Sequence, residues 1–588
     1  MLVSVHPNDV CGEPVISQIW IYVILWLIGI FLVRKIFIRL RLSRAKHPSL
    51  RGHAKMSRRV AKLLRFFEYD ESRFFNSDLA PKDVIDKRKS ALKGLTQHAN
   101  STLEKTIAFS QSLESSISDV SFISAYRVPF PYRNFLPKEL KLGSVVDKSS
   151  GVKLKDLDGN WYYDLSGSYG VNVFGYDFYK ECMEKGMEKV RELGPVLGAY
   201  HPIIRDNVER IKTIAEKEEV SFHMSGTEAV MQAVRLARYH TGRSHLVRLC
   251  GAYHGWWDGV QPGIGNQRNT QDVYTLADLS EATLKVLATR NDIACVLINP
   301  MQALHPNKDA PGDATLINSE RSTDYNCQQY ANWLQKIKDV CQKRNIVLIF
   351  DEVFTGFRLA QGGAQEYFGI QADIVTYGKT LGGGFPVGVV CGSHALMKRY
   401  KDHAPANISF ARGTFNSHPY VMGAMNEFLK RLETEQVQDL YKGAHKVWQD
   451  RVACMNRRFS NEQLPIQVSH LHSVLSVQYL VPSRYNWMLQ FYLRQQGLEL
   501  SWTGTGRLIM SLAYTDDEFN EVISRFVQAA KNMKAHGWWW QDAKLSNKAI
   551  KRFMLVDVLT AQFPLLAKVM LPSKNQLPHH AMERGGSS

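Results

Sequence analysis

The sequence lacks the cysteine patterns that cross-link secreted domains or hold zinc. Its 588 residues contain eight cysteines, and no two of them form a Cys-x-x-Cys pair. This scatter indicates neither a disulfide framework nor a zinc site, so we expect reduced thiols and no metal. With 45% hydrophobic residues the chain can bury a large core, and its length predicts more than one domain.

Charge is absent from one long stretch near the amino terminus. Pro14 to Val33 has twenty residues and no charged side chain, enough for a helix to cross about 30 Å of hydrocarbon. Acids precede this stretch and bases follow it, which is not the order of a cleaved signal peptide. A buried core helix is the alternative. The flanks favour a single-pass anchor within residues 1–45, with the short amino end outside or lumenal and the rest of the chain cytoplasmic.

Acids are missing from the segment that follows. Arg34 to Arg65 contains twelve lysines and arginines and no acid. Such a run can indicate nucleic-acid binding, but directly after a membrane span it is typical of contact with anionic headgroups. We therefore expect residues 14–65 to contact membrane lipid, and we expect no nucleic acid as a partner. Residues 46–125 read as a polar, helical linker region, and no motif stands out from Asp70 to Ala125.

Two apolar runs in the middle of the chain end on chemically useful side chains. Ile346 to Phe350 is followed by the acid Asp351, and Ile374 to Tyr377 is followed by a glycine and Lys379. Short apolar runs of this kind predict buried strands of a parallel sheet, whose carboxyl ends carry the working groups. A lysine can hold an aldehyde cofactor as a Schiff base, and pyridoxal phosphate (PLP) needs an acid at its ring nitrogen. The alternative is an acid that caps a helix and a solvated lysine.

A helix-start motif lies upstream of these strands. Ser225-Gly226-Thr227-Glu228-Ala229 precedes apolar residues at helical spacing. The two hydroxyls fit a simple helix cap. The same groups, together with the free N–H donors and the positive end of the helix, fit a phosphate cradle.

In this order the motifs resemble the class III, fold-type I aminotransferases that use PLP, most closely the glutamate-1-semialdehyde 2,1-aminomutases. DEVFTGFR, GGAQEYFG, GKTLGGGFPVG, SGTEA and GAYHGWWDG carry the resemblance, which covers residues 132–534. It implies that Lys379 is catalytic and carries PLP, and that Asp351 is catalytic and pairs with the ring nitrogen. It implies the following cofactor-binding residues: Ser225, Gly226, Thr227, Tyr253, His254, Asp351, Val353, Lys379 and Thr414.

The resemblance also implies substrate-binding positions, several of which depart from the family pattern. Arg133 has the spacing of an arginine that binds a substrate carboxylate, although the residues before it differ from the family. Tyr169 stands where the aminomutases have a tryptophan, and Asn299 stands where the family usually has a glutamate. Gly506 stands where they have a pocket glutamate. The neighbouring Arg507 either contacts an acidic group or is solvated.

The resemblance implies the fold and the oligomer. We expect an α/β protein of fold-type I, with a large mixed, mostly parallel sheet domain at about residues 200–425. A smaller α+β domain is expected from residues 126–199 and 426–534, so the catalytic region spans 126–534. Thr414 lies in a segment that in the family reaches the phosphate across a dimer, which implies a homodimer. Residues 535–588 form a tail rich in tryptophan and basic residues, which lies either at a membrane interface or against the folded domain.

Together these features predict a membrane-anchored, PLP-dependent enzyme. The first hypothesis is an aminotransferase that transfers an amino group to an aldehyde or ketone, with a lipophilic acceptor suggested by the anchor. The second is a glutamate-1-semialdehyde 2,1-aminomutase, in which the transfer is intramolecular. The third is a catalytically silent scaffold that has kept the fold, which the presence of Lys379 and Asp351 disfavours.

Overall fold

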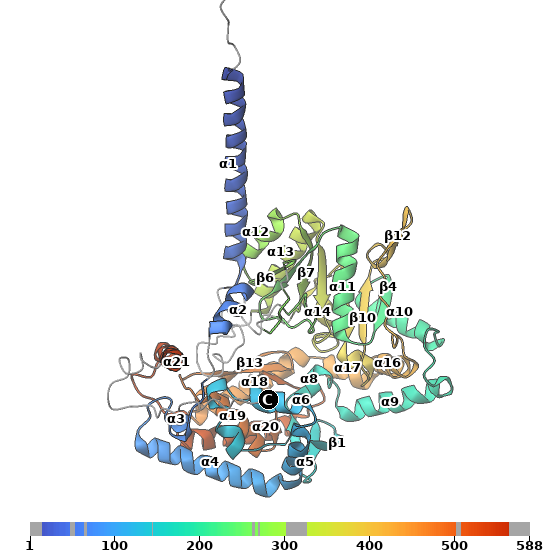
Figure 1. The fold of residues 1–588 in the computed structure, drawn as a ribbon. Coiled ribbons are helices and arrows are strands. Elements are labelled where there is room, and N and C mark those ends of the chain that lie inside the picture. Colours follow the sequence, from blue (N-terminus) through green and yellow to red (C-terminus); the bar gives the residue numbers. More distant parts are fainter. Residues whose placement is uncertain are drawn as a thin grey trace, which may run out of the picture.

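A projecting helix and a two-part folded body make up the protein (Figure 1). The computed structural model describes residues 14–47, 53–63, 67–143, 145–261, 265–268, 271–300, 326–500 and 507–563. In Figure 1 the large sheet domain lies nearest to the projecting helix α1 (Pro14–Ala45), and the small domain lies on the far side.

A seven-stranded mixed sheet forms the centre of the large domain. Its strand order is β4-β10-β9-β8-β7-β5-β6. Strand β10 is antiparallel to both neighbours, and the remaining neighbours pair in parallel, which confirms the predicted mostly parallel sheet. The strands are β4 (Glu219–His223), β5 (His245–Leu249), β6 (Val273–Leu276), β7 (Ile293–Ile298), β8 (Val347–Asp351), β9 (Ile374–Gly378) and β10 (Gly388–Gly392).

Both faces of this sheet are buried, which explains the uninterrupted apolar runs. On β8, Val347 and Ile349 pack in the hydrophobic cluster around α11 (Gly226–Thr241), whereas Leu348 and Phe350 pack in the cluster on the other face. Successive side chains of a strand point to opposite faces, so a strand covered on both sides needs apolar residues at every position. The other helices of the large domain are α9 (Tyr176–Val190), α10 (Ile203–Ala215), α12 (Glu281–Thr289), α13 (Cys327–Arg344), α14 (Gly363–Phe368), α15 (His394–Met397) and α16 (Pro419–Arg431), and the hairpin β11 (Tyr400–Lys401)–β12 (Ala404–Ile408) projects from it.

The small domain contains two short sheets. One has the order β1-β2-β3-β15 and the other β13-β14-β16. Strands β2 and β3 pair in antiparallel and form a hairpin around Asp158-Gly159. The elements are β1 (Val146–Ser150), β2 (Lys153–Asp156), β3 (Trp161–Asp164), β13 (Ile466–Leu471), β14 (Val474–Tyr479), β15 (Leu498–Glu499), β16 (Arg507–Ile509), α7 (Leu136–Glu139), α8 (Gly167–Gly170), α17 (Glu435–Tyr441), α18 (Ala444–Asn461), α19 (Leu489–Gln495) and α20 (Asp516–Ala535).

The residues before the catalytic region form helices, most of which pack on the small domain, whereas Arg58 of the first one donates to the carbonyls of Asn266 and Arg268 in the large domain. The helices are α2 (Ala54–Leu63), α3 (Glu71–Phe75), α4 (Lys82–Thr102), α5 (Glu104–Glu114) and α6 (Ser118–Tyr126). The fully buried guanidinium of Arg88 on α4 binds both oxygens of Asp78, at 2.8 and 2.7 Å, and donates to the carbonyl of Gly537 at 2.9 Å. The Asp158 carboxylate accepts the N–H groups of Lys105 and Thr106 and so caps α5.

The carboxyl-terminal tail packs against the folded body, which is the second of the two predicted alternatives. The indole N–H of Trp538 donates to the Tyr492 hydroxyl at 2.7 Å, and both Trp538 and Trp539 are buried. Helix α21 (Asn547–Gln562) follows. Its Asp557 accepts hydrogen bonds from the Tyr69 hydroxyl at 2.5 Å and from Arg484 at 3.0 Å. The tail and the first helices are thus joined through one buried carboxylate.

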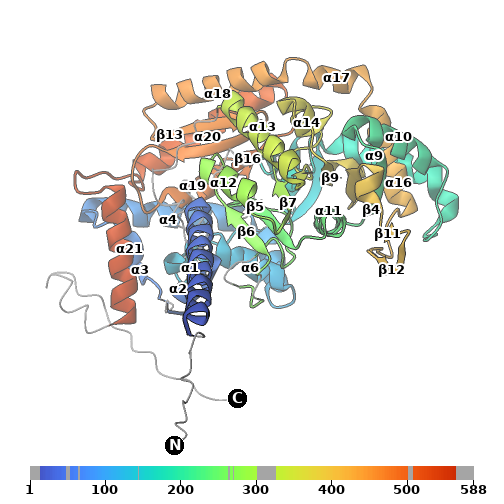
Figure 2. The same cartoon turned by 90° about the horizontal axis from the view of Figure 1, so that it is seen from above.

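Among the described residues, helix α1 contacts the large domain through its carboxyl end. It is long and apolar enough to cross a membrane, and its most apolar window is not buried. The carbonyl of Ala45 accepts the N–H of Ala277 at 2.9 Å, and the last turns of α1 pack along α12. Because α12 begins near Ala277, the two helices run antiparallel. Figures 1 and 2 both show α12 beside α1.

The buried Arg88–Asp78 pair provides a test of the packing of the first helices. Arg88→Met leaves the Asp78 carboxylate buried without its cation, so we expect the free energy of unfolding to fall by about 3–5 kcal/mol. Lys89→Ala is the matched control, because Lys89 makes an exposed ion pair with Glu71, and such pairs contribute about 0–1 kcal/mol. Urea unfolding of the full-length protein, followed by tryptophan fluorescence, measures both. Equal small losses in the two variants would contradict this packing.

Candidate active site

Asp351 and Lys379 stand at the carboxyl ends of adjacent parallel strands, as the sequence predicts. Asp351 is the last residue of β8 and pairs in register with Thr376 of β9. Lys379 follows three residues later and begins a short 3-10 helix, Lys379–Gly382. Its backbone has a φ of 48°, so the chain turns sharply as it leaves the sheet. The side chains therefore meet at one edge of the sheet.

The Asp351 carboxylate is buried and held by three donors. His254 Nδ1 lies 2.7 Å from one carboxylate oxygen. The other oxygen accepts the N–H of Val353 at 3.1 Å and the Thr376 hydroxyl at 3.3 Å. Hydrogen bonds of this kind fix the orientation of the carboxylate.

The neighbouring acid, Glu352, serves the scaffold instead. It points to the opposite face of the sheet, where its oxygens accept the N–H groups of Ala364 at 2.5 Å and Gln365 at 3.0 Å, at the start of α14. Burial raises the pKa of Glu352 to about 7. A carboxyl group that loses its charge near neutral pH is a poor permanent counter-ion, so Asp351 is the better candidate for a cationic ring.

The Lys379 amine lies in an environment that favours its neutral form. Burial lowers the pKa of Lys379, the nearby Asp351 carboxylate raises it, and the Arg358 guanidinium lowers it. The balance is a lowered pKa. A lysine with a lowered pKa keeps more of its amine unprotonated near neutral pH, as a nucleophile or general base requires.

Segments far apart in the sequence converge on this edge of the sheet. Ser225 caps α11 by accepting the N–H of Glu228, which confirms the predicted helix start. A Cβ added at Gly226 would lie 2.7 Å from a methyl group of Val353, and one added at Gly255 would lie 2.5 Å from the Thr227 hydroxyl. The helix start, the segment after Asp351 and the segment around His254 are therefore in contact.

These residues fit PLP. The Nε2 atom of buried His254 has no hydrogen-bond partner within the described part of the chain, and Tyr253 beside it exposes 61% of its surface. The amino end of α11 presents backbone N–H groups for a phosphate, and the close contact at Gly226 lets the backbone approach Val353. The edge thus offers a lysine, a buried carboxylic acid, an aromatic ring and a phosphate cradle together.

Comparison with known proteins assigns the family. The family described as Aminotransferase class-III matches residues 137–530. The chain belongs to the class III aminotransferases. These are PLP-dependent enzymes, and the described geometry agrees with that chemistry.

Several relatives are named as aminomutases. The chain is 36% identical over 322 residues to a glutamate-1-semialdehyde 2,1-aminomutase of Methanocaldococcus jannaschii. The matched region covers 52% of this chain and 68% of the relative. It is 29% identical over 415 residues to the enzyme of that name from Alkaliphilus oremlandii, covering 66% and 91%.

Solved structures share the fold at lower identity. A glutamate-1-semialdehyde aminomutase from Pseudomonas aeruginosa in complex with PMP matches with a TM-score of 0.60 and 15% identity, covering 76% of this chain and 99% of that one. A β-phenylalanine aminotransferase from Variovorax paradoxus matches with a TM-score of 0.60 and 22% identity, covering 76% and 98%. The predicted fold-type I architecture is confirmed.

The loop that carries Tyr169 packs directly on the segment that follows Asp351. Ser168 and Tyr169 have φ values of 45° and 57°, and a Cβ at Gly170 would lie 2.4 Å from the Phe354 ring. The Asp164 carboxylate holds the loop by accepting the Ser166 hydroxyl at 2.6 Å. Tyr169 is thereby fixed beside the segment after Asp351 with its side chain largely exposed.

The other predicted substrate residues occupy different surroundings. Asn299 follows β7 directly, and the pairing of Ile298 with Phe350 places it beside Asp351 at the same edge. Arg507 begins β16 in the small domain. Arg133 donates to the carbonyl of Val128 at 2.9 Å. Gly506 lies outside the described residues.

Thr414 lies in an exposed turn of the large domain. Within the described residues no hydrogen bond joins its hydroxyl to Asp351, Lys379 or the start of α11, so its predicted role requires a second chain. The residues around it, Phe410 and Phe415, are likewise exposed.

Two further groups at the edge were not predicted as site residues. Fully buried Arg358 donates to the Met510 carbonyl at 2.7 Å and to the Gly170 carbonyl at 3.3 Å, which ties the Tyr169 loop to the small domain. The Tyr179 hydroxyl lies 2.5 Å from the hydroxyl of Thr380, the residue after the lysine. Arg358 lies within the DEVFTGFR motif, and a buried arginine there is the signal that could have identified it.

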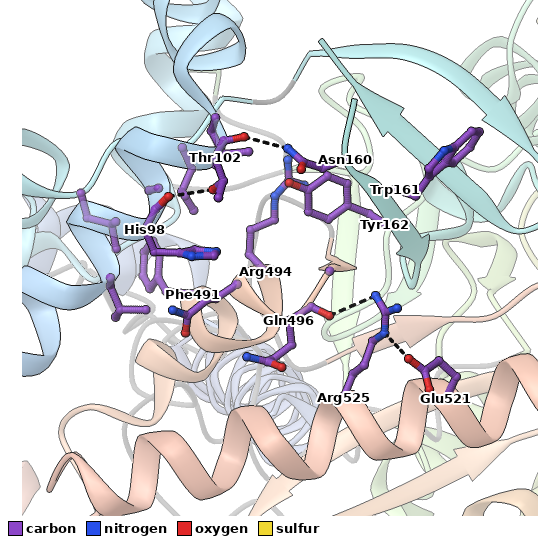
Figure 3. A pocket seen from close by; sticks show the side chains of 17 residues that line it. His98, Thr102, Asn160, Trp161, Tyr162, Phe491, Arg494, Gln496, Glu521 and Arg525 are labelled. Carbon is purple, nitrogen blue, oxygen red and sulfur yellow. Dashed lines mark hydrogen bonds and ion pairs between the residues drawn. The ribbon is translucent and has the colours of Figure 1, made fainter. Parts of the chain in front are cut away.

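A separate cavity of about 500 Å³ lies between α4 and the small domain (Figure 3). Its lining includes Phe491 and Tyr162, and its arginines already have acidic partners: Arg525 pairs with Glu521 at 2.7 Å, and Arg494 pairs with Glu499. None of the predicted catalytic or cofactor residues lines it. This cavity is not the active site.

Proposed function

We propose that the protein is an intermolecular aminotransferase, anchored in a membrane by α1, that transfers an amino group from a donor to an aldehyde or ketone. The observation that carries the proposal is the placement of Asp351 and Lys379 at the ends of adjacent strands, beside the start of α11. A lysine for the cofactor, an acid for its ring and a cradle for its phosphate are the parts that amino transfer needs.

The proposed roles follow from the contacts of each residue. PLP, when bound, supplies an aldehyde that condenses with amines and a ring that accepts electrons. Lys379 Nζ holds the cofactor between turnovers and then takes and returns the substrate proton, which its lowered pKa favours. The charge of Asp351 keeps the ring nitrogen protonated, and His254 and Thr376 keep that carboxylate in place. The hydroxyl of Thr227 and the N–H groups of α11 bind the phosphate.

A homodimer is part of this proposal. In the single chain Tyr253, Trp256, Phe410 and Phe415 expose at least half of their surface, and Tyr253 and Trp256 flank His254. Large aromatic residues that are this exposed are typical of a surface that a partner covers. A second chain that covers them brings its own Thr414 to the phosphate. If both chains are anchored in one bilayer, the two-fold axis runs along the membrane normal.

The lipophilic nature of the acceptor stays a prediction that rests on α1. The active site lies at the carboxyl edge of the sheet, whereas α1 extends past the opposite edge. We therefore expect an amphiphilic acceptor, whose apolar body associates with the membrane and whose carbonyl lies on a more polar portion that reaches the active site. We expect it to be turned over faster than a small soluble keto acid.

The aminomutase is the second candidate, and the names of the relatives favour it. Asn299, beside Asp351, is uncharged where the family usually has a glutamate, which indicates that substrate recognition differs. Tyr169 and Gly506 also replace pocket residues of the aminomutases.

Conversion of glutamate-1-semialdehyde without an amino donor separates the two candidates. We expect the enzyme, loaded with PLP, to produce no 5-aminolevulinate from the semialdehyde alone, because an intermolecular transferase takes its amino group from a separate donor, whereas the aminomutase moves the amino group that the semialdehyde itself carries. Product analysis by mass spectrometry measures this, with Lys379→Ala as the inactive control. Sustained turnover without a donor would establish the aminomutase, and a protein inactive with every donor and acceptor would leave the silent scaffold.

Mixed dimers test the proposed role of Thr414. Thr414→Ala removes one hydrogen bond to the phosphate, so we expect a loss of PLP affinity of about tenfold or more. Co-expression of Lys379→Ala chains with Thr414→Ala chains gives mixed dimers with one doubly altered site and one site without either substitution. These dimers should recover about half of the wild-type activity, because the intact site combines Lys379 of one chain with Thr414 of the other. Recovery no greater than that of Thr414→Ala alone would show that Thr414 acts within its own chain.

A further inference from the structure

The position of α1 determines which edge of the large sheet faces a bilayer. Helix α1 ends at Ala45, which is bonded to Ala277, and α12 begins four residues after Ala277 at Glu281 and runs antiparallel to α1. The nine residues of α12 span about 14 Å, so its end at Thr289 lies level with about Phe37 of α1. That point is only about 6 Å along the helix from Val33, the end of the uncharged stretch. The edge where β5, β7 and β8 begin therefore lies close to the membrane boundary.

We infer that this amino-terminal edge of the large sheet lies against the membrane and that a basic hollow in it binds anionic phospholipid headgroups. The inference rests on the proposed anchoring by α1 and adds a lipid-binding surface on the catalytic domain itself. The hairpin β11–β12 points in the same direction as α1 (Figure 1), and Figure 2 looks down on this edge.

The hollow has a volume of about 550 Å³ and lies where α11 ends. It is bounded by the starts of β5 and β7 and by the hairpin β11–β12. The residues that line it are Arg238, Tyr239, Gly242, Arg243, Ser244, Asn291, Asp292, Lys401 and Asn407.

The charges of the hollow are predominantly positive. Arg238 pairs with Asp272 at 2.8 Å, and Arg290 pairs with Asp292, so these two carboxylates are matched by two arginines. Arg243 donates instead to three uncharged backbone carbonyls, those of residues 293, 344 and 345, at distances from 2.9 to 3.2 Å. Its positive charge is therefore not neutralised by these contacts.

Lys401 adds a second such cation. Its ammonium lies 5.4 Å from the centre of the Tyr239 ring, at the wall of the hollow. Lys401 and Arg243 thus give the hollow two positive charges in addition to the two neutral Arg–Asp ion pairs. Phosphate oxygens of a lipid headgroup are suitable partners for guanidinium and ammonium groups in an open polar hollow.

The place of the hollow favours a lipid headgroup over a soluble anion as the occupant. Each lysine or arginine near an anionic bilayer contributes about 1 kcal/mol, but only within a Debye length of about 8–10 Å. The hollow meets that condition because it lies at the amino-terminal edge of the sheet, which is only about 6 Å from Val33 along the axis of α1. With the edge held there, Asp351 and Lys379 open on the side away from the bilayer.

Hydrogen exchange of the full-length, PLP-loaded protein in nanodiscs tests the inference. The discs contain either phosphatidylcholine alone or phosphatidylcholine mixed with phosphatidylserine. We expect slower exchange of residues 238–246 and 400–408 in the discs with phosphatidylserine, and no such difference around Asp351. Lys401→Glu, alone and combined with Arg243→Gln, should reduce this protection by about fivefold for each cation lost. Lys401→Glu leaves the Arg243 hydrogen bonds intact, so the test does not depend on the folding of the double variant.

Lys93→Glu is the matched control, because Lys93 is an exposed lysine of α4 on the far side of the molecule. It should leave the protection unchanged. Equal exchange in both kinds of disc would overturn the inference, and so would equal protection by inorganic phosphate in detergent, which would identify a soluble anion. Extraction of the protein from membranes by alkaline carbonate would instead contradict the anchoring. A protein that resists extraction but shows no dependence on phosphatidylserine would keep the anchor and lose only the headgroup site.

Discussion

Asp351 and Thr376 face each other across β8 and β9, and this parallel register sets where Lys379 leaves the sheet. A shift of one residue would turn the Asp351 side chain to the other face, where Glu352 now contacts α14. The hydrogen bonds from His254, Val353 and Thr376 hold the carboxylate in the orientation that the register provides. Two adjacent acids thus have separate tasks because successive strand residues point to opposite faces.

The second constraint is the attachment of α1, which orients the catalytic domain. Since α1 packs along α12 and is fixed at Ala45, the two edges of the sheet acquire different surroundings. One edge carries the basic hollow, and the other carries the lysine and the acid. Helices α3 to α5 and the tail are joined to the small domain through buried Arg88 and Asp557, so they lie away from the edge that carries the basic hollow.

The features that the sequence predicts well are those set by local pattern. The apolar runs before Asp351 and Lys379 form β8 and β9, and the motif at Ser225 starts α11, because periodicity and capping depend on neighbouring residues. The motif order predicts the family and with it the fold.

The features that it does not predict depend on contacts between distant residues. Asp557 binds Tyr69 although they are separated by 488 positions, and no local signal indicates this pairing. For the same reason the burial of Trp538 and Trp539 could not be separated from an interfacial location. The role of Arg358 depends on Gly170 and Met510, which lie outside its own motif.

Reduction of the PLP-loaded, full-length protein with borohydride, followed by peptide mapping, tests the central claim most directly. The account predicts that the cofactor becomes fixed to the peptide that contains Lys379, and that prior incubation with an effective amino donor prevents this labelling. Labelling of a different lysine, or bound cofactor that cannot be fixed to any lysine, would contradict it.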